Sequence, residues 1–194
     1  ASTFPAGSQS PWSVCTGDFD GDGRDDVAAA DRFNEWICVL IADEDGSLGE
    51  GTLYPAGTYT VDLCACDVDA DGALDLVTAD AHSGTVTVLP GEGGGTFGAG
   101  IVHAIGGEPT AVIAADLDGD GVIDIAVADP ASGAIVFLRG TGGGDLAPPV
   151  RYAAAGAPVA LFAADLDGDG DAEIAAVGGE DGILSILENL TGGG

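Results

Sequence analysis

The sequence predicts an all-β chain folded as a four-bladed β-propeller, with four antiparallel strands in each blade. Two observations predict this fold. An acidic loop of nine residues recurs four times, and its first aspartate stands at positions 18, 67, 116 and 165, a constant spacing of 49. Each loop is flanked by short apolar segments, and no segment has a sustained helical period. A constant period of this size indicates repeated supersecondary units, so we expect residues 1–194 to form one domain of four 49-residue repeats.

Each repeat is expected to contribute four strands. The first precedes the acidic loop, at Trp12–Thr16, Val61–Cys66, Thr110–Ala115 and Val159–Ala164. The second follows the loop, at Val27–Ala30, Leu76–Ala79, Ile125–Ala128 and Ile174–Val177. The third is rich in the β-branched and aromatic residues that strands favour, at Trp36–Ile41, Thr85–Leu89, Ala134–Leu138 and Ile183–Leu187. The fourth follows a Gly-rich turn, at Gly51–Pro55, Ala99–Ala104 and Pro149–Ala153. Four antiparallel strands per repeat are typical of a propeller blade.

The acidic loops have the composition of a calcium site. Each places carboxylates at positions 1, 3, 5 and 9, and the glycine at position 6 lets the backbone turn sharply so that they converge. A set of oxygen ligands favours a hard cation with six to eight ligands, hence Ca²⁺ rather than Zn²⁺ or Mg²⁺. The expected carboxylate ligands are Asp18, Asp20, Asp22 and Asp26 (loop 18–26), Asp67, Asp69, Asp71 and Asp75 (67–75), Asp116, Asp118, Asp120 and Asp124 (116–124), and Asp165, Asp167, Asp169 and Glu173 (165–173). Position 7 is expected to contribute a backbone oxygen, from Arg24, Ala73, Val122 or Asp171, giving about four Ca²⁺ per chain.

These loops do not fit an EF-hand. The EF-hand needs a bidentate glutamate at position 12 and flanking helices. Position 12 here is Ala29, Thr78, Val127 or Ala176, and the flanking patterns are those of strands.

The charge of the chain excludes one class of partner. Formal net charge is −29, with 33 acidic residues against four arginines and no lysine. Four bound Ca²⁺ would reduce this only to −21, a charge that repels phosphate backbones, so we expect no nucleic-acid partner. The apolar runs are about 5–8 residues long, far short of the ~20 that a membrane-spanning helix needs, so we expect no membrane insertion.

One stretch resembles a known repeat family. Phe97-Gly98-Ala99-Gly100, followed by the D-x-D-G-D-G-x-x-D loop, is similar to the FG-GAP (VCBS, integrin-alpha-like) propeller repeat. That resemblance implies a calcium loop between the first two strands of each blade. Three departures stand out: the F-G-x-G element is altered at Leu48–Gly51 and Leu146–Pro149, Ala70 replaces a glycine, and Glu173 replaces the last aspartate. The family also usually has about seven blades.

The fourth repeat ends without a fourth strand, and the first residues of the chain look like one. The segment Ala1–Ala6 is similar to Gly51–Ala56, which is a fourth strand. We therefore expect Ser2–Ala6 to pair with the Ile183–Leu187 strand, either in the same molecule or in a neighbour.

The remaining motifs leave several functions open. Four cysteines (Cys15, Cys38, Cys64 and Cys66) favour disulfides between the first two repeats, with three possible pairings, over zinc or free thiols. The main interpretation is a secreted, calcium-binding β-propeller that acts as a non-catalytic binding or structural module with an unknown protein or glycan ligand. Alternatives are a filament subunit assembled by exchange of the terminal strand, and a carbohydrate-binding or adhesion protein in which Trp12 or Trp36 stacks on a sugar. A hydrolase is the weakest alternative, because carboxylate pairs in metal loops are ligands and no pair has neighbours that would distinguish a catalytic acid and base.

Overall fold

The four repeats fold into four antiparallel sheets, as the computed structural model shows for residues 10–166, 168, 172–179 and 182–187. The first sheet consists of β1 (Pro11–Gly17), β2 (Asp26–Asp31), β3 (Trp36–Leu40) and β4 (Thr52–Pro55). The second consists of β5 (Thr60–Cys66), β6 (Asp75–Asp80), β7 (Thr85–Leu89) and β10 (Ile101–Ala104). The third consists of β11 (Ala111–Ala115), β12 (Asp124–Asp129), β13 (Ala134–Leu138) and β16 (Val150–Ala153). The fourth has three strands among the described residues, β17 (Pro158–Ala164), β18 (Glu173–Gly178) and β19 (Leu184–Leu187). The predicted strands are confirmed to within one or two residues at each end.

Two short hairpins were not predicted from the sequence. They are β8 (Gly91–Gly93) with β9 (Thr96–Phe97), and β14 (Gly140–Gly142) with β15 (Asp145–Leu146). Each connects the third strand of its sheet to the outermost strand, and each lies where the sequence reads only as a Gly-rich turn.

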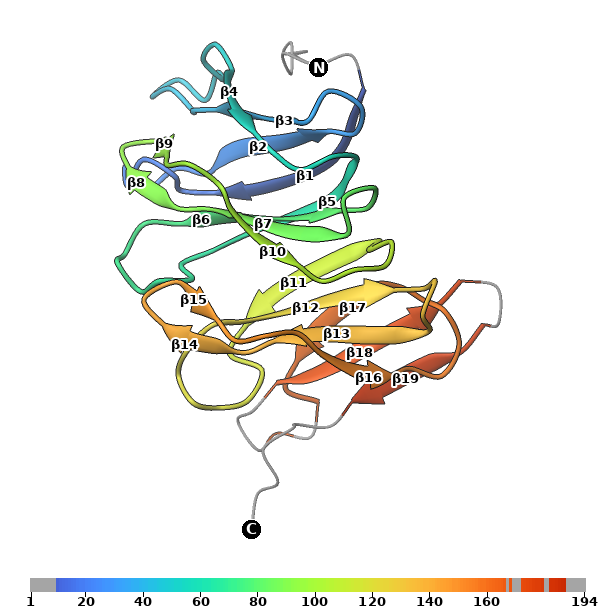
Figure 1. Ribbon diagram of the computed structural model, residues 1–194. Coiled ribbons are helices and arrows are strands. Elements are labelled where there is room, and N and C mark those ends of the chain that lie inside the picture. Colours follow the sequence, from blue (N-terminus) through green and yellow to red (C-terminus); the bar gives the residue numbers. More distant parts are fainter. Residues whose placement is uncertain (1–9, 167, 169–171, 180–181, 188–194) are drawn as a thin grey trace.

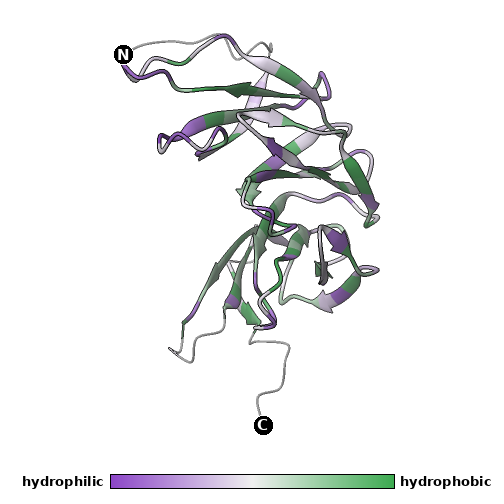
Figure 2. Cartoon of the chain, turned by 90° about the vertical axis from the view of Figure 1, so that its left-hand side faces the viewer, coloured by the Kyte–Doolittle hydropathy of each residue, from purple (hydrophilic) through white to green (hydrophobic). Residues whose placement is uncertain are grey.

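The sheets stack face to face in chain order, with the first at one end and the fourth at the other (Figure 1). Three apolar clusters fill the three spaces between successive sheets. Ile37, Leu76 and Leu89 are buried between the first and second sheets, and Ile125 and Val136 belong to the cluster between the second and third. Figure 2 shows this division, with the strands mainly hydrophobic and the connecting loops carrying much of the hydrophilic colour. A strand buried on both faces loses the alternation of apolar and polar residues, which explains the continuous apolar runs of β12 and β13.

The innermost strands of successive sheets are also joined by hydrogen bonds. Ser13 in β1 donates its hydroxyl to Oδ1 of Asp62 in β5, 49 residues further on, over 2.9 Å. The amide of Val112 in β11 donates to the other oxygen of Asp62 over 3.0 Å. The carboxylate of Asp62 therefore links three sheets.

The described residues form an open stack rather than the predicted closed ring. No strand of the first sheet pairs with a strand of the fourth in the part of the chain that the structure describes, and the two sheets lie at opposite ends (Figure 1). Each sheet is held by its immediate neighbours, so nothing among these residues brings the two ends together. The predicted pairing of Ser2–Ala6 with the fourth sheet lies outside the described residues.

Among the described residues, no helix is long and apolar enough to cross a membrane.

Candidate metal centre

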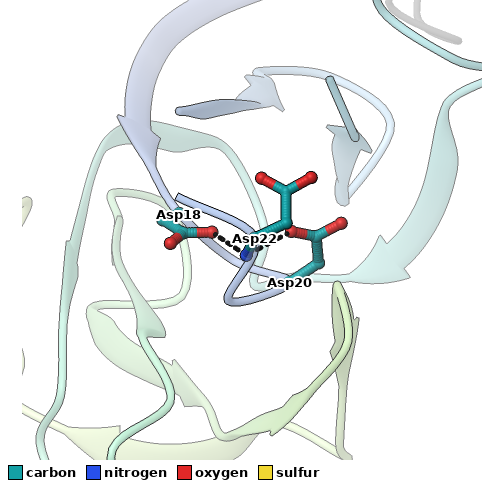
Figure 3. A group of neighbouring side chains, drawn as sticks. All are labelled: Asp18, Asp20 and Asp22. Atoms are coloured by element: carbon teal, nitrogen blue, oxygen red, sulfur yellow. Dashed lines mark hydrogen bonds between the residues drawn. The ribbon is translucent and has the colours of Figure 1, made fainter. Parts of the chain in front are cut away.

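The three acidic loops that the structure describes over their full length each bring carboxylates together at one point. The loops connect the first and second strands of their sheets, as the sequence predicted. In each described cluster, one oxygen from each of three carboxyl groups lies within 4.8 Å of the others; the clusters are Asp18, Asp20 and Asp22; Asp67, Asp69 and Asp71; and Asp116, Asp118 and Asp124. Figure 3 shows the first cluster, with the three side chains arranged around the turn of the loop.

The tight turn depends on left-handed backbone conformations. Gly21 and Gly23 in the first loop have φ of 79° and 88°, values that residues with a side chain rarely adopt. In the second loop Ala70 stands where the others have glycine, and it takes the same conformation, with φ of 63°. The second loop therefore keeps the geometry of the first and carries the strain of a non-glycine residue in the left-handed region.

The aspartate at position 1 organises each loop. In the first loop, Oδ1 of Asp18 accepts from the amides of Gly21 (2.8 Å) and Asp22 (3.0 Å), and Oδ2 accepts from the amide of Gly23 (2.9 Å). Asp67 and Asp116 accept from the matching amides of positions 5 and 6 in their own loops. These bonds hold the backbone so that the side chains of positions 3 and 5 face the same point.

The carboxylates of the first loop are crowded. The pKa of Asp20 is raised by loss of hydration, with further contributions from the negative charges of Asp22, Asp26 and Asp18. Like charges so close together disfavour one another unless a cation neutralises them.

The carboxylate at position 9 has a second role that the sequence did not predict. Asp75 is buried, and its oxygens accept from the amide of Val68 within the loop (2.8 Å) and from the amide of Gly91 at the start of β8 (2.7 Å). Asp26 and Asp124 make the same two bonds in their repeats, and Glu173 makes the bond within its loop. Among the three described clusters, position 9 belongs only to that of the third loop, as Asp124. The residue predicted as the last ligand of the loop therefore also anchors the loop to the segment that follows the third strand.

Each hairpin covers the acidic loop of the preceding sheet. The amide of Gly95, in the β8–β9 turn, donates to the carbonyl oxygen of Phe19 in the first loop over 2.9 Å. The ring of Phe97 in β9 packs edge-on against Phe19, with centroids 5.5 Å apart, and against Tyr54, at 5.3 Å. In the next repeat, Leu146 of β15 packs in the same cluster as Val68 of the second loop. The altered F-G-x-G element of the third repeat therefore keeps an apolar contact.

Two of the loops hold a guanidinium: Arg24, at position 7 of the first loop, pairs with Asp22, and Arg139 reaches the third loop from the end of the third strand of its sheet. Nε of Arg139 lies 2.9 Å from Oδ2 of Asp118, and its Nη2 lies 2.8 Å from Oδ2 of Asp120. The matching residues in the first two repeats are Ile41 and Pro90, which carry no charge. The hydrogen bond from Arg139 lowers the pKa of Asp120. A guanidinium thus partly neutralises this loop already.

The other predicted ligands divide into two groups. At position 7, the amides of Arg24, Ala73 and Val122 donate to the position 5 carboxylates over 2.8–2.9 Å, which places them inside the turn. In the fourth loop Asp167, Asp169 and Asp171 lie outside the described residues. Asp165 accepts from the amide of Gly168 over 2.6 Å, the bond that Asp18 makes to Gly21 in the first loop.

A second set of repeated aspartates was missed at the opposite ends of the sheets. Asp31, Asp80 and Asp129 end their β2-type strands, recur every 49 residues and are buried. Asp80 accepts from four threonine hydroxyls, and Asp129 pairs with Arg151 over 2.7 Å. Their common spacing of 49 residues could have revealed them in the sequence. The groups that bond to their carboxylates differ from repeat to repeat.

The same edge carries a pocket of about 530 Å³. Arg32, Tyr59, His82 and Glu108 line it together with Pro109 and Pro130. The guanidinium of Arg32 lies between the ring of Trp12 (3.9 Å) and that of Tyr59 (4.2 Å), and His82 stacks on Tyr59 with centroids 3.9 Å apart. One face of Trp12 is therefore covered by Arg32 and not available to a sugar.

All four cysteines are free thiols in the structure, so the predicted disulfides are not formed. Cys15 and Cys64 occupy the same position in adjacent repeats. Cys15 packs in the cluster between the first and second sheets, and Cys64 in that between the second and third. Their side chains therefore point the same way along the stack and do not face each other. Burial raises the pKa of Cys15 to about 12 and also raises that of Cys64, which keeps both thiols protonated at neutral pH.

Comparison with protein families identifies the repeat. The model of the FG-GAP-like repeat matches three times, over residues 18–78, 67–127 and 116–176. The chain belongs to the FG-GAP-like repeat family. Each match begins at the first aspartate of an acidic loop and extends beyond the next loop, so each match to this FG-GAP-like chain contains two successive loops. No curated protein matches it.

Solved structures show the same fold at low identity. The BBS1N chain in its complex with ARL6DN, in crystals soaked with lead or mercury, is 16% or 15% identical with TM-scores of 0.59 and 0.61. These matches cover 93% and 92% of this chain, which spans 57–58% of the length of those chains. A chain of the Photorhabdus luminescens Tc holotoxin pore is 20% identical, with a TM-score of 0.57. The match covers 89% of this chain and 9% of the toxin chain. These FG-GAP-like sheets thus have a β-propeller-like arrangement.

Proposed function

We propose that this FG-GAP-like chain is a secreted, calcium-stabilised β-propeller module that binds a partner or supports a larger assembly without catalysis. The observation that carries the proposal is the convergence of three carboxylates in each of three loops at the same position of the repeat. Carboxylate and backbone oxygens are the ligands that Ca²⁺ prefers, and the chain's charge of −29 leaves these sites without enough cations of its own.

The ion would join two repeats rather than one. Its carboxylates come from one sheet, whereas the hairpin of the next sheet covers the first and second loops through Gly95, Phe97 and Leu146. If Ca²⁺ binds only the folded state, each site adds about 2.7 kcal/mol to the free energy of unfolding when free Ca²⁺ is 100-fold above its dissociation constant. Calcium would therefore stabilise the contacts between successive sheets. Such a role suits a module exposed to the high calcium concentration outside cells.

Isothermal titration of chelator-treated protein tests the site. We expect four Ca²⁺ per chain, with dissociation constants of about 10⁻⁴–10⁻³ M, the range of extracellular modules. Asp20→Asn and Asp69→Asn should each remove one site, whereas Asp45→Asn, an exposed aspartate outside the loops, should leave the number unchanged. Zero or one site per chain would refute the proposal. EDTA should also lower the unfolding midpoint, and a midpoint that does not move would refute the stabilising role.

The pocket at the opposite edge favours carbohydrate binding as a second candidate. Its prolines offer an apolar floor, and Glu108, His82 and Tyr59 offer the few polar groups that orient a ligand in such pockets. A glycan array with the wild type and Tyr59→Ala tests this candidate. A glycan that binds the wild type but not Tyr59→Ala would support this candidate. If the wild type binds no glycan on the array, the candidate is excluded.

A further inference from the structure

Arg32 differs from the other three arginines of the chain. Arg24, Arg139 and Arg151 each pair with an aspartate side chain. Arg32 forms no ion pair in the part of the chain that the structure describes, and its Nε is buried there without a hydrogen-bond partner. In a chain with 33 acidic residues and four arginines, a guanidinium without a carboxylate partner is unexpected, because burying a charge without a counter-charge costs free energy.

Aromatic rings hold this guanidinium in place. It lies between the rings of Trp12 and Tyr59, and His82 continues the stack on Tyr59. Stacking on the faces of a guanidinium leaves its N–H groups free in their own plane, and these groups bind a carboxylate through two parallel hydrogen bonds. Arg32 is therefore oriented in advance for an anionic group, which reduces the side-chain entropy that binding would cost.

The repeat does not require the polar side chains of this stack. One and two repeats after Arg32, the same position holds Ala81 and Pro130, and one repeat after His82 it holds Ala131. The sheets of these repeats have the same strands with these different residues in their turns. The arginine and the histidine are therefore features of the pocket rather than of the fold.

The pocket beside Arg32 offers both a donor and an acceptor to a ligand. Its volume is about 530 Å³, and its lining comes from the turns of the first three sheets. Glu108 also lines the pocket, and it forms no ion pair with Arg32. A guanidinium only donates hydrogen bonds, and an ionised carboxylate only accepts them. A matching ligand therefore carries a carboxylate for Arg32, hydroxyl groups for Glu108 and an apolar face for Pro109 and Pro130.

We propose that this pocket binds an acidic sugar, a hexuronate whose carboxylate is held by Arg32. The inference rests on the carbohydrate-binding candidate above and names the class of sugar. A hexuronate has a carboxylate, several hydroxyl groups and an apolar C–H face on a single ring, so it matches each part of the lining. An acidic peptide matches less well, because its N–H donors lie on the backbone, away from the side-chain carboxylate that would reach Arg32.

An NMR titration of the calcium-loaded protein tests the proposal. The ligands are the methyl glycosides of glucuronate, galacturonate and mannuronate, each compared with its uncharged methyl ester. The wild type should bind at least one acid about tenfold or more tightly than its ester, since esterification removes a charge-assisted pair of hydrogen bonds. This comparison needs no variant.

Arg32→Gln should reduce binding of that acid to the level of its ester. Arg139→Gln is the matched control, because it makes the same change in net charge at the acidic loops, on the opposite edge of the sheets. It should leave the preference for the acid unchanged. Circular dichroism in calcium confirms that both variants are folded.

The outcomes separate this inference from the candidate on which it rests. Equal binding of acid and ester by the wild type would overturn the role of Arg32 and leave the carbohydrate candidate standing. If none of these sugars binds, the inference is overturned, and the glycan array decides the candidate separately. A preference for the acid that persists in Arg32→Gln would also overturn it, because the carboxylate would then be bound elsewhere, for example through Ca²⁺ at the loops. Binding of N-acetylglutamate amide in place of every sugar would overturn it and assign Arg32 to an acidic peptide.

Discussion

The amide of Gly95 donates a hydrogen bond to the carbonyl oxygen of Phe19 over 2.9 Å, although the two residues belong to different repeats. Phe19 is position 2 of the first acidic loop, and Gly95 is in the turn of the β8–β9 hairpin. The bond therefore connects a candidate calcium loop of one sheet to the sheet that follows. It couples the candidate metal loop to the packing between repeats, and the first two predictions follow from it.

Phe97→Ala should lower both stability and calcium binding at the first loop. The Phe97 ring is buried and packs edge-on against Phe19 and Tyr54, so its removal should cost about 3–5 kcal/mol of unfolding free energy. Urea unfolding and calcium titration measure the two effects. Phe137→Ala is the control, because Phe137 is equally buried but lies between the third and fourth sheets. Equal calcium binding in both variants would show that the hairpin does not support the loop.

Gly95→Ala should destabilise the protein more than Gly93→Ala. Both glycines have left-handed φ, 76° and 74°, so the backbone cost of a side chain is shared. A Cβ at Gly95 would lie 2.6 Å from Cδ1 of Ile41, whereas a Cβ at Gly93 would meet nothing within 4 Å. We expect a difference of about 1–3 kcal/mol in urea unfolding, the usual cost of overpacking. Equal losses would mean that the hairpin can move away from the loop without penalty.

Arg139→Gln should strengthen calcium binding at the third loop. The guanidinium contacts Asp118 and Asp120, and its charge opposes a divalent ion at the same carboxylates. We expect one of the dissociation constants in a titration to fall about tenfold, a change of about 1.4 kcal/mol. Arg151→Gln, which removes an arginine paired with Asp129 at the opposite edge, should leave all of them unchanged. Weaker binding in Arg139→Gln would show instead that the arginine holds the loop in its binding conformation.

Asp80→Asn should remove part of the pH dependence of stability. Burial raises the pKa of Asp80 above the value of about 3.9 in unfolded chains, against the opposing effect of four threonine hydroxyls. The folded protein then binds this proton more tightly than the unfolded chain, so the contribution of Asp80 to stability increases as pH falls from 7 towards about 3.9, and pH 7 and pH 5 sample the upper part of that range. Urea unfolding at both pH values, in saturating Ca²⁺, should show a smaller gain on acidification for the variant than for the wild type.

Asp129→Asn is the matched control for that measurement. Asp129 is the counterpart of Asp80 one repeat later. Burial acts to raise its pKa, but the hydrogen bonds from Arg151, Ser132 and the amide of Glu108 outweigh burial and lower it. Its contribution to stability is lost only below about pH 3.9, so this variant should shift stability equally at pH 7 and pH 5. A pH dependence of Asp80→Asn identical to that of the wild type would contradict the assignment.

The sequence by itself determined the repeat, its strands and its acidic loops. The 49-residue period, the D-x-D-x-D pattern and the short apolar segments of each repeat are all features of the local sequence. They can therefore be recognised without knowledge of any long-range contact. The convergence of Asp18, Asp20 and Asp22 is equally local, since left-handed glycines close the turn within five residues.

Tertiary structure alone decided how repeats act on one another. The hairpin of one sheet meets the loop of another, the position 9 carboxylate bonds to an amide 16 residues away, and Arg139 reaches a loop 19 residues before it. Cys15 and Cys64 could be counted in the sequence, but only the stack shows that they point in the same direction and stay apart. Whether the stack closes on itself depends on the relative orientation of whole sheets. That orientation is set by packing between faces, and no residue pattern within one repeat encodes it.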